Sequence, residues 1–549
     1  MILCPGTRNI PLISAFSSNN EYICHSYVDE RSAAFFALGK ALVSGHPVAI
    51  VCTSGSAVMN FAPAVSEAYY RHIPLIVISA DRPEEWIDQD DSQTIRQNNV
   101  LSNIVKKSFL IQETGGRNDM RHYVWRVVND SMICALSDTQ GPVHLNVPLH
   151  MPLNGMVDYD WDSRYERIRC VTPQRLELTI IRELACRIQS TEKVLIVSGF
   201  NAPSARLTRS ISRLLLLPNV SVLDENLSNL HLNAGSISPD ILIDSVFDDY
   251  DYVPRILITF GGSIVSQRLK KWLRHHSASI EHWHVSPDDN VIDTYNCLRL
   301  KIPMIPEEFF PQLTASLRKN NPLSSSGYNE LWKKLKSTIS LQISGIVAKS
   351  SWNALTAMQR IISKLNSRTN LQVSNGMSVR YLMFIPESYD LHRVDCNRGV
   401  SGIDGSTSTA IGASAAYTGI TVFMSGDMSA RYDVSGIIEA IERTKNFKMV
   451  IFDNGGGNIF NVISSSQGLD FVDKYMYGMS HMSWRGLMES VGWQCFEASS
   501  FEELDSSMPL WLTRRDSPSA LIVHLQCEND TAIYRQIFES VNILNGNTK

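Results

Sequence analysis

Short apolar runs alternate with longer amphipathic stretches along almost the whole chain, and this alternation is typical of parallel α/β sheets. The pattern divides into three sections, which cover residues 1–165, 180–320 and 350–549. The clearest predicted strands in these sections are 48–52, 74–79, 194–197, 255–260, 421–424 and 449–452. We therefore predict an α/β fold with three doubly wound parallel-sheet domains at those bounds.

The joins between the sections are polar and contain turn-forming residues. Residues 320–327 read Asn-Asn-Pro-Leu-Ser-Ser-Ser-Gly, and the stretch 150–180 contains Pro152 and Pro173. Proline, glycine and serine clusters of this kind mark loops. We expect the domain boundaries to lie in these two joins.

The first and third sections repeat the same pattern of strand, glycine-containing turn, helix and strand. Gly55 precedes Asp81 at almost the same spacing as Gly426 precedes Asp453. The repeat predicts two similar sheets. The alternative is that all strand–helix–strand units look alike at this level of detail.

A candidate metal site follows the two apolar strands of the third section. Asp427 comes directly after one strand, and Asn454 comes directly after the next strand along the chain. The carboxyl ends of parallel strands meet at one edge of the sheet, where ligands bind. A carboxylate, an amide oxygen and a main-chain oxygen there would suit Mg²⁺. The alternative is an ordinary turn aspartate followed by a glycine-rich loop.

Length and composition narrow the class of protein. A chain of 549 residues is too long for one core, and its 44% hydrophobic and 19% charged residues are typical of globular proteins. The net charge of −5 gives no support to nucleic-acid binding, and no apolar run reaches the roughly 18 residues of a membrane span. The first residues lack the pattern of a signal peptide. Ten cysteines without CxxC pairs fit free thiols in the cytoplasm.

The spacing from Gly426-Asp427 to Asn454 resembles the cofactor motif of the thiamine diphosphate (ThDP) enzymes. The resemblance implies that Asp427, Asn454 and the Gly456 carbonyl hold Mg²⁺ or Mn²⁺, which anchors the cofactor diphosphate. It implies a pyrimidine-binding domain at 1–165, a central domain at 180–320 and a diphosphate-binding domain at 350–549. Asp453 stands where the family often has Asn. The further cofactor contacts that it implies are Thr7, Ile403, Gly426, Met428, Ser429, Ile459 and Phe460. Ile403 would be an apolar wedge beneath the bent cofactor, and the alternative is an ordinary core residue.

ThDP chemistry needs one protein carboxyl that hydrogen-bonds the cofactor's pyrimidine ring in an apolar pocket. Glu30 is the candidate, because it opens a predicted helix of apolar and small residues in the first section. The alternative is a first-turn glutamate that the helix dipole favours.

Within these enzymes the chain resembles the 2-succinyl-5-enolpyruvyl-6-hydroxy-3-cyclohexene-1-carboxylate (SEPHCHC) synthases of menaquinone biosynthesis. The segments that carry the resemblance are 4–8, 28–32, 52–57, 79–83, 397–405 and 453–460. The resemblance implies decarboxylation of 2-oxoglutarate and conjugate addition of the remaining unit to isochorismate. Both substrates are dicarboxylates, which guanidinium groups bind well. The implied substrate contacts are Arg8, Arg82, Gln93, Arg268, Arg380 and Arg398.

The resemblance also implies a homodimer or a homotetramer, in which Glu30 of one chain and Asp427 of another serve one active site. Three departures stand out. Gln267 replaces a usual basic residue, Thr7 replaces Ser, and residues 374–376 read Ser-Asn-Gly instead of Gly-Asn-Ser, so a hydroxyl is lost or moved to Ser378. Relatives carry a helix before the strand at residues 1–3, which suggests a truncated start.

Three other functions compete with this interpretation. The first is another ThDP-dependent 2-oxoacid decarboxylase or carboligase, and the second is a non-catalytic binding protein with the same fold. The third is a nicotinamide-binding enzyme, suggested by Gly261-Gly262 and by the glycines at 455–457. Neither glycine cluster makes the GxGxxG pattern that dinucleotide binding requires.

Overall fold

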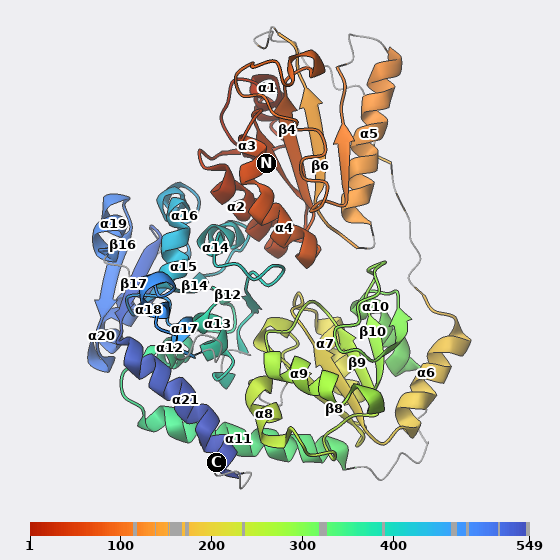
Figure 1. Cartoon of the computed structure of the whole chain (residues 1–549), viewed down its shortest axis with the longest axis vertical. Helices are drawn as coiled ribbons and strands as arrows, with labels where there is room; N and C mark the ends of the chain where they lie inside the picture. Colours follow the sequence, from red (N-terminus) through yellow and green to blue (C-terminus); the bar gives the residue numbers. More distant parts are fainter. Residues whose placement is uncertain are drawn as a thin grey trace.

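The computed structural model describes residues 1–113, 118–137, 139–151, 153, 167–168, 170, 175–232, 237–317, 327–386, 390–462, 469–478, 482–513 and 516–544. Three sheets with helices packed around them make up the molecule, and every strand pair within them is parallel. Figure 1 shows the N-terminal sheet at the top, the C-terminal sheet on the left and the central sheet on the right. The predicted α/β class with three parallel sheets is confirmed.

The N-terminal sheet has six strands in the order β2-β1-β3-β4-β6-β5. Its strands are β1 (Ile2–Leu3), β2 (His25–Ser26), β3 (Val48–Cys52), β4 (Leu75–Asp81), β5 (Lys107–Leu110) and β6 (Val143–Pro148). Its helices are α1 (Ile10–Ser17), α2 (Glu30–Ser44), α3 (Ala57–Asn60), α4 (Ala62–Arg71) and α5 (Asn118–Leu136), with a short 3₁₀ turn η1 (Glu84–Trp86).

The central sheet has five strands in the order β11-β10-β9-β7-β8. Its strands are β7 (Val194–Ser198), β8 (Val220–Asp224), β9 (Ile256–Phe260), β10 (Glu281–Val285) and β11 (Leu298–Ile302). Its helices are α6 (Leu178–Ser190), α7 (Ala205–Leu214), α8 (Pro239–Val246), α9 (Gln267–His275) and α10 (Pro306–Ala315), with 3₁₀ turns η2 (Asn226–Ser228) and η3 (Ser277–Ser279). The long helix α11 (Tyr328–Lys349) then runs below both lower sheets in Figure 1.

The C-terminal sheet has six strands in the order β13-β12-β14-β15-β17-β16. Its strands are β12 (Asn370–Val373), β13 (Arg393–Asp395), β14 (Thr421–Gly426), β15 (Phe447–Asp453), β16 (Gln494–Ala498) and β17 (Ser519–His524). Its helices are α12 (Ala354–Ile362), α13 (Met377–Leu382), α14 (Ser406–Ala415), α15 (Asp427–Tyr432), α16 (Val434–Glu439), α17 (Ile459–Val462), α18 (Val472–Tyr475), α19 (Trp484–Ser490), α20 (Phe501–Thr513) and α21 (Cys527–Leu544), with the 3₁₀ turn η5 (Ala440–Glu442).

The N-terminal and C-terminal sheets share one topology, because their strands follow the same order from edge to edge. This agreement confirms the repeat that the sequence pattern predicted. The predicted joins fall mainly outside the described residues, including Pro152, Pro173 and residues 320–326. The exact domain bounds therefore stay a prediction.

Helices α2 and α14 hold the N-terminal and C-terminal sheets together through a very close crossing. A Cβ atom on Gly39 would lie 1.9 Å from the carbonyl oxygen of Thr409, and one on Gly412 would lie 2.0 Å from that of Phe36. Glycine at both positions therefore lets the two backbones touch. One hydrophobic cluster continues across this contact, from Phe36 to Phe423.

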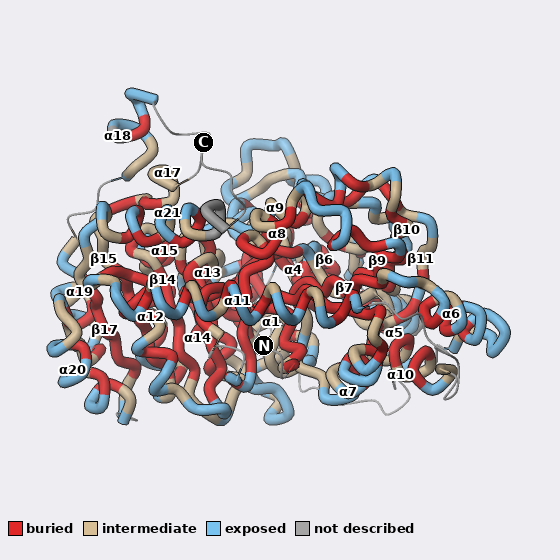
Figure 2. Tube along the Cα trace, turned by 90° about the horizontal axis from the view of Figure 1, so that it is seen from below, coloured by how far each residue is buried: buried red, intermediate tan, exposed pale blue. Residues whose placement is uncertain are grey.

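A second hydrophobic cluster joins the central and C-terminal sheets through α11 and α21. The strands of all three sheets are largely buried, as the tube in Figure 2 shows. Within the described part of the chain, no helix is both long and apolar enough to cross a membrane.

Candidate functional site

Asp427 lies at the carboxyl edge of the C-terminal sheet, where it begins α15 and is only 1% exposed. The N–H of Met428 donates to its Oδ1 at 2.7 Å. Its Oδ2 is buried without a hydrogen-bond partner, although the N–H groups of Gly455 and Gly456 approach the carboxylate. Burial raises the pKa of Asp427 to about 7, and the charge of Asp453 adds to the rise. A buried carboxylate oxygen in this state is costly unless a cation or a proton faces it.

Asn454 lies in the loop that follows the neighbouring strand β15. Its Nδ2 donates to Asp530 Oδ2 at 2.9 Å, which leaves its Oδ1 on the opposite side of the amide. The loop is held by Tyr477, whose carbonyl accepts from the Gly457 N–H at 2.6 Å. A Cβ atom on Gly456 would lie 2.3 Å from the ring of Tyr477, so the loop packs closely there.

The structure places Asp427 beside the loop that contains Asn454 and Gly456, the other two metal ligands that the resemblance implied. Gly426 pairs with Phe452 across β14 and β15, so Asp427 and the loop with Asn454 leave the sheet at the same edge. One carboxylate, one amide oxygen and one main-chain oxygen from these residues would suit Mg²⁺ or Mn²⁺. No group of three His, Cys, Asp or Glu side chains forms an alternative metal site in the part of the chain that the structure covers.

The other predicted cofactor contacts lie around this edge or near the N-terminal sheet. Ile403 precedes α14 and is 38% exposed, so it is not a core residue; its carbonyl accepts from the Ser429 hydroxyl at 2.8 Å. Met428 and Ser429 belong to the first turn of α15, and the ends of α17 and β14 carry the rest of the C-terminal set, Ile459, Phe460 and Gly426. Thr7 lies apart from them, in the exposed turn before α1.

Glu30 begins helix α2 beside the N-terminal sheet. The preceding Asp29 caps the helix by accepting from the N–H groups of Arg31 and Ser32. Burial, and after it the charge of Glu30, raises the pKa of the Cys4 thiol at the end of β1. The partly buried Glu30 carboxylate therefore lies close to the carboxyl edge of the N-terminal sheet.

Three of the predicted substrate contacts form a group on the N-terminal sheet. Arg8 is 5% exposed and donates to the Leu149 carbonyl at 2.8 Å. Burial, and after it the charge of Arg82, lowers the pKa of Arg8, which shows that the two guanidinium groups are neighbours. The backbone of Gln93 lies close to Gly55, because a Cβ atom added to Gly55 would lie 3.3 Å from it.

The other three predicted contacts form a second group between the central and C-terminal sheets. Arg398 donates to Asn375 Oδ1 at 3.0 Å, and it is a neighbour of Arg380, whose pKa is lowered by burial first. Arg268 forms an ion pair with Asp244 and lies over the ring of Phe538. Among the described residues, no hydrogen bond or ion pair joins this group to the N-terminal one. The predicted set of six is distributed over two parts of the fold, with three residues on the N-terminal sheet and three on the central and C-terminal sections.

The loop that carries Arg398 and Ile403 is fastened by α4 of the N-terminal section. Glu67 accepts from the N–H groups of Gly399 and Val400, both at 2.7 Å. Arg71 donates to the Cys396 carbonyl at 2.7 Å and forms a buried ion pair with Asp395. The N-terminal section therefore fixes a loop of the C-terminal site within the same chain.

Sequence reasoning missed Lys270 and Glu225 beside Arg398. Lys270 makes no hydrogen bond or ion pair with the described residues, and burial, followed by Arg398, lowers its pKa. Glu225 is buried and accepts from the N–H groups of Val265 and Ser266, both at 2.8 Å. Burial raises the pKa of Glu225 to about 7. The only signal for Lys270 in the sequence was its place one helical turn after position 267, where Gln267 replaces a usual basic residue.

The departure at 374–376 has a visible backbone reason. Gly376 adopts a φ of 90°, which glycine tolerates and other residues rarely adopt. Ser378 is buried, and its hydroxyl lies 3.5 Å from that of Ser374. The hydroxyl at position 378 therefore faces another serine.

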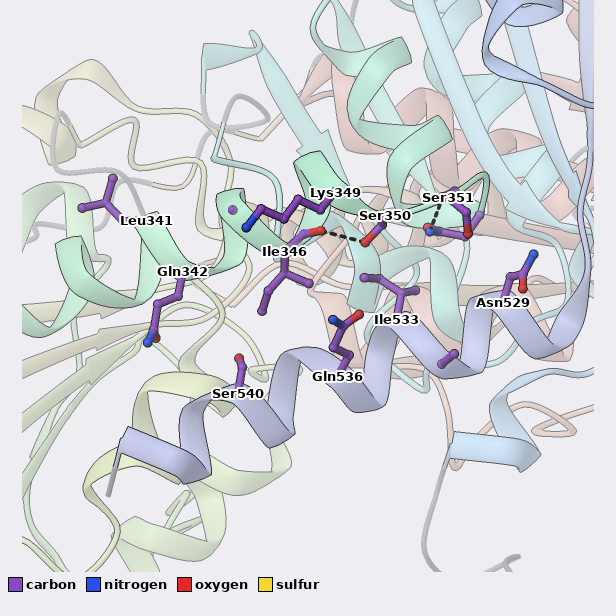
Figure 3. A pocket seen from close by; sticks show the side chains of 13 residues that line it. Leu341, Gln342, Ile346, Lys349, Ser350, Ser351, Asn529, Ile533, Gln536 and Ser540 are labelled. Carbon is purple, nitrogen blue, oxygen red and sulfur yellow. Dashed lines mark hydrogen bonds between the residues drawn. The ribbon is translucent and has the colours of Figure 1, made fainter. Parts of the chain in front are cut away.

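A groove elsewhere in the described part of the chain does not coincide with this site. It lies between α11 and α21, has a volume of about 670 Å³ and contains none of the predicted site residues (Figure 3). Its α21 wall includes Asn529, Ile533 and Gln536, which occupy a different face of the helix from Asp530 and Tyr534. The candidate site therefore lies at the sheet edges and not in this groove.

Two parallel sheets of one topology, with a buried carboxylate at the edge of the second, are the arrangement expected of the ThDP class of enzymes. In agreement, residues 1–100 match the family described as "Thiamine pyrophosphate enzyme, N-terminal TPP binding domain", thiamine pyrophosphate being another name for ThDP.

Curated relatives identify the family more closely. The SEPHCHC synthase of Porphyromonas gingivalis is 32% identical over 551 residues, which cover 99% of this chain and 94% of that protein. The SEPHCHC synthase of Flavobacterium johnsoniae is 34% identical over 549 residues, covering 98% and 96%. That of Flavobacterium psychrophilum is 36% identical over 482 residues, covering 86% and 84%. The chain belongs to the SEPHCHC synthase family and is a ThDP-dependent enzyme, which confirms the resemblance and sets the three competing functions aside.

Proposed function

We propose that this chain decarboxylates 2-oxoglutarate and adds the remaining four-carbon unit to isochorismate, in the synthesis of menaquinone. Family membership over nearly the whole chain carries this proposal. Bound ThDP would supply the electron sink that makes the decarboxylation possible. The protein's own part is to bind two dicarboxylates, exclude water and hold one proton.

The metal site of the proposal consists of Asp427, Asn454 and the carbonyl of Gly456. The buried, partnerless Oδ2 of Asp427 supports it, because an Mg²⁺ or Mn²⁺ ion there would offset the cost of that burial. The ion would in turn hold the diphosphate of the cofactor against the C-terminal sheet.

Glu30 would share a proton with the pyrimidine ring nitrogen of the cofactor. Its position at the edge of the N-terminal sheet, beside the buried Cys4 and Cys52, supports this role because an apolar setting favours the shared proton.

The two groups of arginine, lysine and glutamine side chains would bind the substrate carboxylates. Arg380, Arg398 and Lys270 form the C-terminal half of the anion pocket, and Arg8, Arg82 and Gln93 form the other half. The two halves would form one pocket if the N-terminal sheet of one chain faced the C-terminal sheet of another. We therefore propose a homodimer as the minimum assembly, with a homotetramer as an extension of it.

Exposed apolar residues beside the two sheet edges support a covering partner chain. Val28 is 74% exposed and Tyr432 is 53% exposed, close to the point where Arg31 donates to the Tyr432 carbonyl. Burial of these two side chains by a partner chain would be favourable, because it removes apolar surface from water. The contact of Arg31 also brings α2 near the end of α15 in one chain, so the alternative is a site formed within each chain.

Mixing two inactive variants distinguishes these arrangements. Glu30→Gln removes the acid and Asp427→Asn removes a metal ligand, and each homodimer should be inactive. If the site joins two chains, a mixed dimer contains one site with both substitutions and one intact site, so co-expression should restore activity. If the site lies within one chain, every site carries one defect and no activity should return.

The substrate assignment is tested by offering 2-oxoglutarate or pyruvate as the donor, each with isochorismate. Carbon dioxide release from 2-oxoglutarate alone is expected, and turnover of pyruvate alone would overturn the assignment.

We also place the protein in the cytoplasm, because all ten of its cysteines are free of disulfides.

A further inference from the structure

We infer that Asp530 is a positioning residue, which fixes the side-chain amide of Asn454 so that its oxygen faces the cation site. The inference rests on the proposed metal site and adds to it a residue from α21. Asp530 itself would touch neither the cation nor the cofactor.

The hydrogen bonds of Asp530 leave its carboxylate no freedom to turn. The residue is fully buried, and its Oδ1 accepts from the N–H of Ala354, the first residue of α12, at 2.7 Å. Its Oδ2 accepts from Asn454 Nδ2 at 2.9 Å. Its main-chain carbonyl accepts from the hydroxyl of Tyr381 at 3.0 Å. Each contact comes from a different element, so the position of Asp530 is set by the packing of the C-terminal sheet.

The chemistry of the pair determines which way the amide of Asn454 points. An ionised carboxylate can only accept hydrogen bonds, so the group that faces Asp530 must be the amide nitrogen. The amide oxygen then lies on the side of the amide away from Asp530, and in the proposed site that side faces the cation. A turned amide would present N–H groups to the cation in place of a lone pair.

Asp530→Asn is the sharpest single change, because it keeps the size and shape of the side chain. The Ala354 N–H needs an acceptor, so the oxygen of the new amide should keep that bond and its NH₂ group should face Asn454. Two NH₂ groups cannot face each other, and the Asn454 amide should therefore turn its oxygen away from the cation site. We expect the affinity for Mn²⁺ in the presence of ThDP to fall about 10- to 100-fold, the usual effect of losing such a supporting group.

A compensating change restores the correct pairing. In the double variant Asn454→Asp with Asp530→Asn, the new amide at position 530 can donate to the new carboxylate at position 454, which keeps an oxygen for the cation. The net charge of the pair equals that of the wild type. We expect Mn²⁺ affinity to return to within about threefold of the wild type or above it, since an oxygen faces the cation again and the net charge of the pair is unchanged.

The measurement is calorimetric titration of Mn²⁺ into each protein with ThDP present, together with thermal unfolding without either ligand. The matched control is Asp505→Asn, which removes an exposed carboxylate paired with Arg360 and should leave Mn²⁺ affinity unchanged. If Asp530→Asn lowers the melting temperature but leaves Mn²⁺ affinity intact, Asp530 only supports the fold and the inference is wrong. Failure of the double variant to exceed Asn454→Asp alone also overturns it, and that comparison holds even if Asp530→Asn does not fold.

The same series separates this inference from the metal site on which it rests. Asn454→Ala should weaken Mn²⁺ binding if the site is correct. No effect of Asn454→Ala would remove the proposed metal site, whereas a loss there with no loss in Asp530→Asn would remove only the role of Asp530.

Discussion

Replacing Gly39 with alanine should separate two helices that the active site needs in contact. The added Cβ atom would lie 1.9 Å from the Thr409 carbonyl oxygen and 2.7 Å from its carbon, and both belong to backbone that cannot rotate away. Carbon and oxygen atoms normally stay about 3.5 Å apart. Helices α2 and α14 would therefore have to move apart by more than about 1 Å.

The energetic cost follows from two opposing effects. Overpacking of a close contact typically costs about 1–3 kcal/mol. Alanine in place of glycine within a helix returns about 1 kcal/mol. We expect a net loss of up to about 2 kcal/mol. Each kcal/mol lowers the melting temperature of a domain of this size by roughly 2–4 °C.

Turnover should fall by more than the loss of stability alone would explain, because α2 begins with Glu30 and α14 follows the loop of Ile403. A displacement of about 1 Å in an active site can reduce turnover about 100-fold. The assay is kcat/KM for 2-oxoglutarate together with thermal unfolding. Gly345→Ala on α11 is the matched control: nothing lies within 4 Å of its added Cβ atom, so it should slightly stabilise the protein and leave turnover unchanged. Unchanged stability and turnover in Gly39→Ala would refute the close-crossing argument.

Three further substitutions test the site. Asp427→Asn should leave the ligand-free protein at least as stable as the wild type, because it removes a carboxylate oxygen that is buried without a partner. The rise in melting temperature that Mg²⁺ and ThDP cause should disappear in this variant. A retained rise would exclude Asp427 as a ligand. Burial raises the pKa of Glu225 to about 7 in the folded protein, against 4.5 normally. As the pH rises from about 5 to 8, the wild type should therefore lose up to about 3 kcal/mol of stability. The variant Glu225→Gln has no carboxyl to ionise and should not show this loss. Urea unfolding at the two pH values measures this, and equal slopes with pH would contradict it. Lys270→Gln should raise the KM for one dicarboxylate about tenfold. The control is Lys271→Gln, which should leave KM unchanged because the ammonium of Lys271 lies over the ring of Phe247. Equal KM values in both variants would remove Lys270 from the pocket.

The sheets and the cation site could be predicted because local pattern decides them. A parallel strand buried on both faces reads as an apolar run, and the residue after it must lie at the sheet edge. The prediction of 48–52 matches β3, whereas β15 extends beyond the predicted 449–452 at both ends, because Phe447, Lys448 and Asp453 also pair with neighbouring strands.

Partners that are distant in the chain left no such pattern. Asp530 is 76 residues from Asn454 and belongs to another element, so no spacing rule connects the two. The division of the arginines into two groups was equally hidden, because it depends on how the three sheets pack. Lys270 could have been found only by asking what replaces the basic residue missing at position 267.

The bonds from Glu67 to the loop at Gly399 and Val400 limit how this enzyme can be recombined with its relatives. A chimera that exchanges the N-terminal section also exchanges the side chain that holds this loop, although the two are far apart in the sequence. Grafted N-terminal halves should therefore work only when they bring a glutamate at position 67 and an arginine at position 71. In a chimera, the N-terminal and C-terminal sections should therefore be taken from the same parent protein, even though each has a complete sheet of its own.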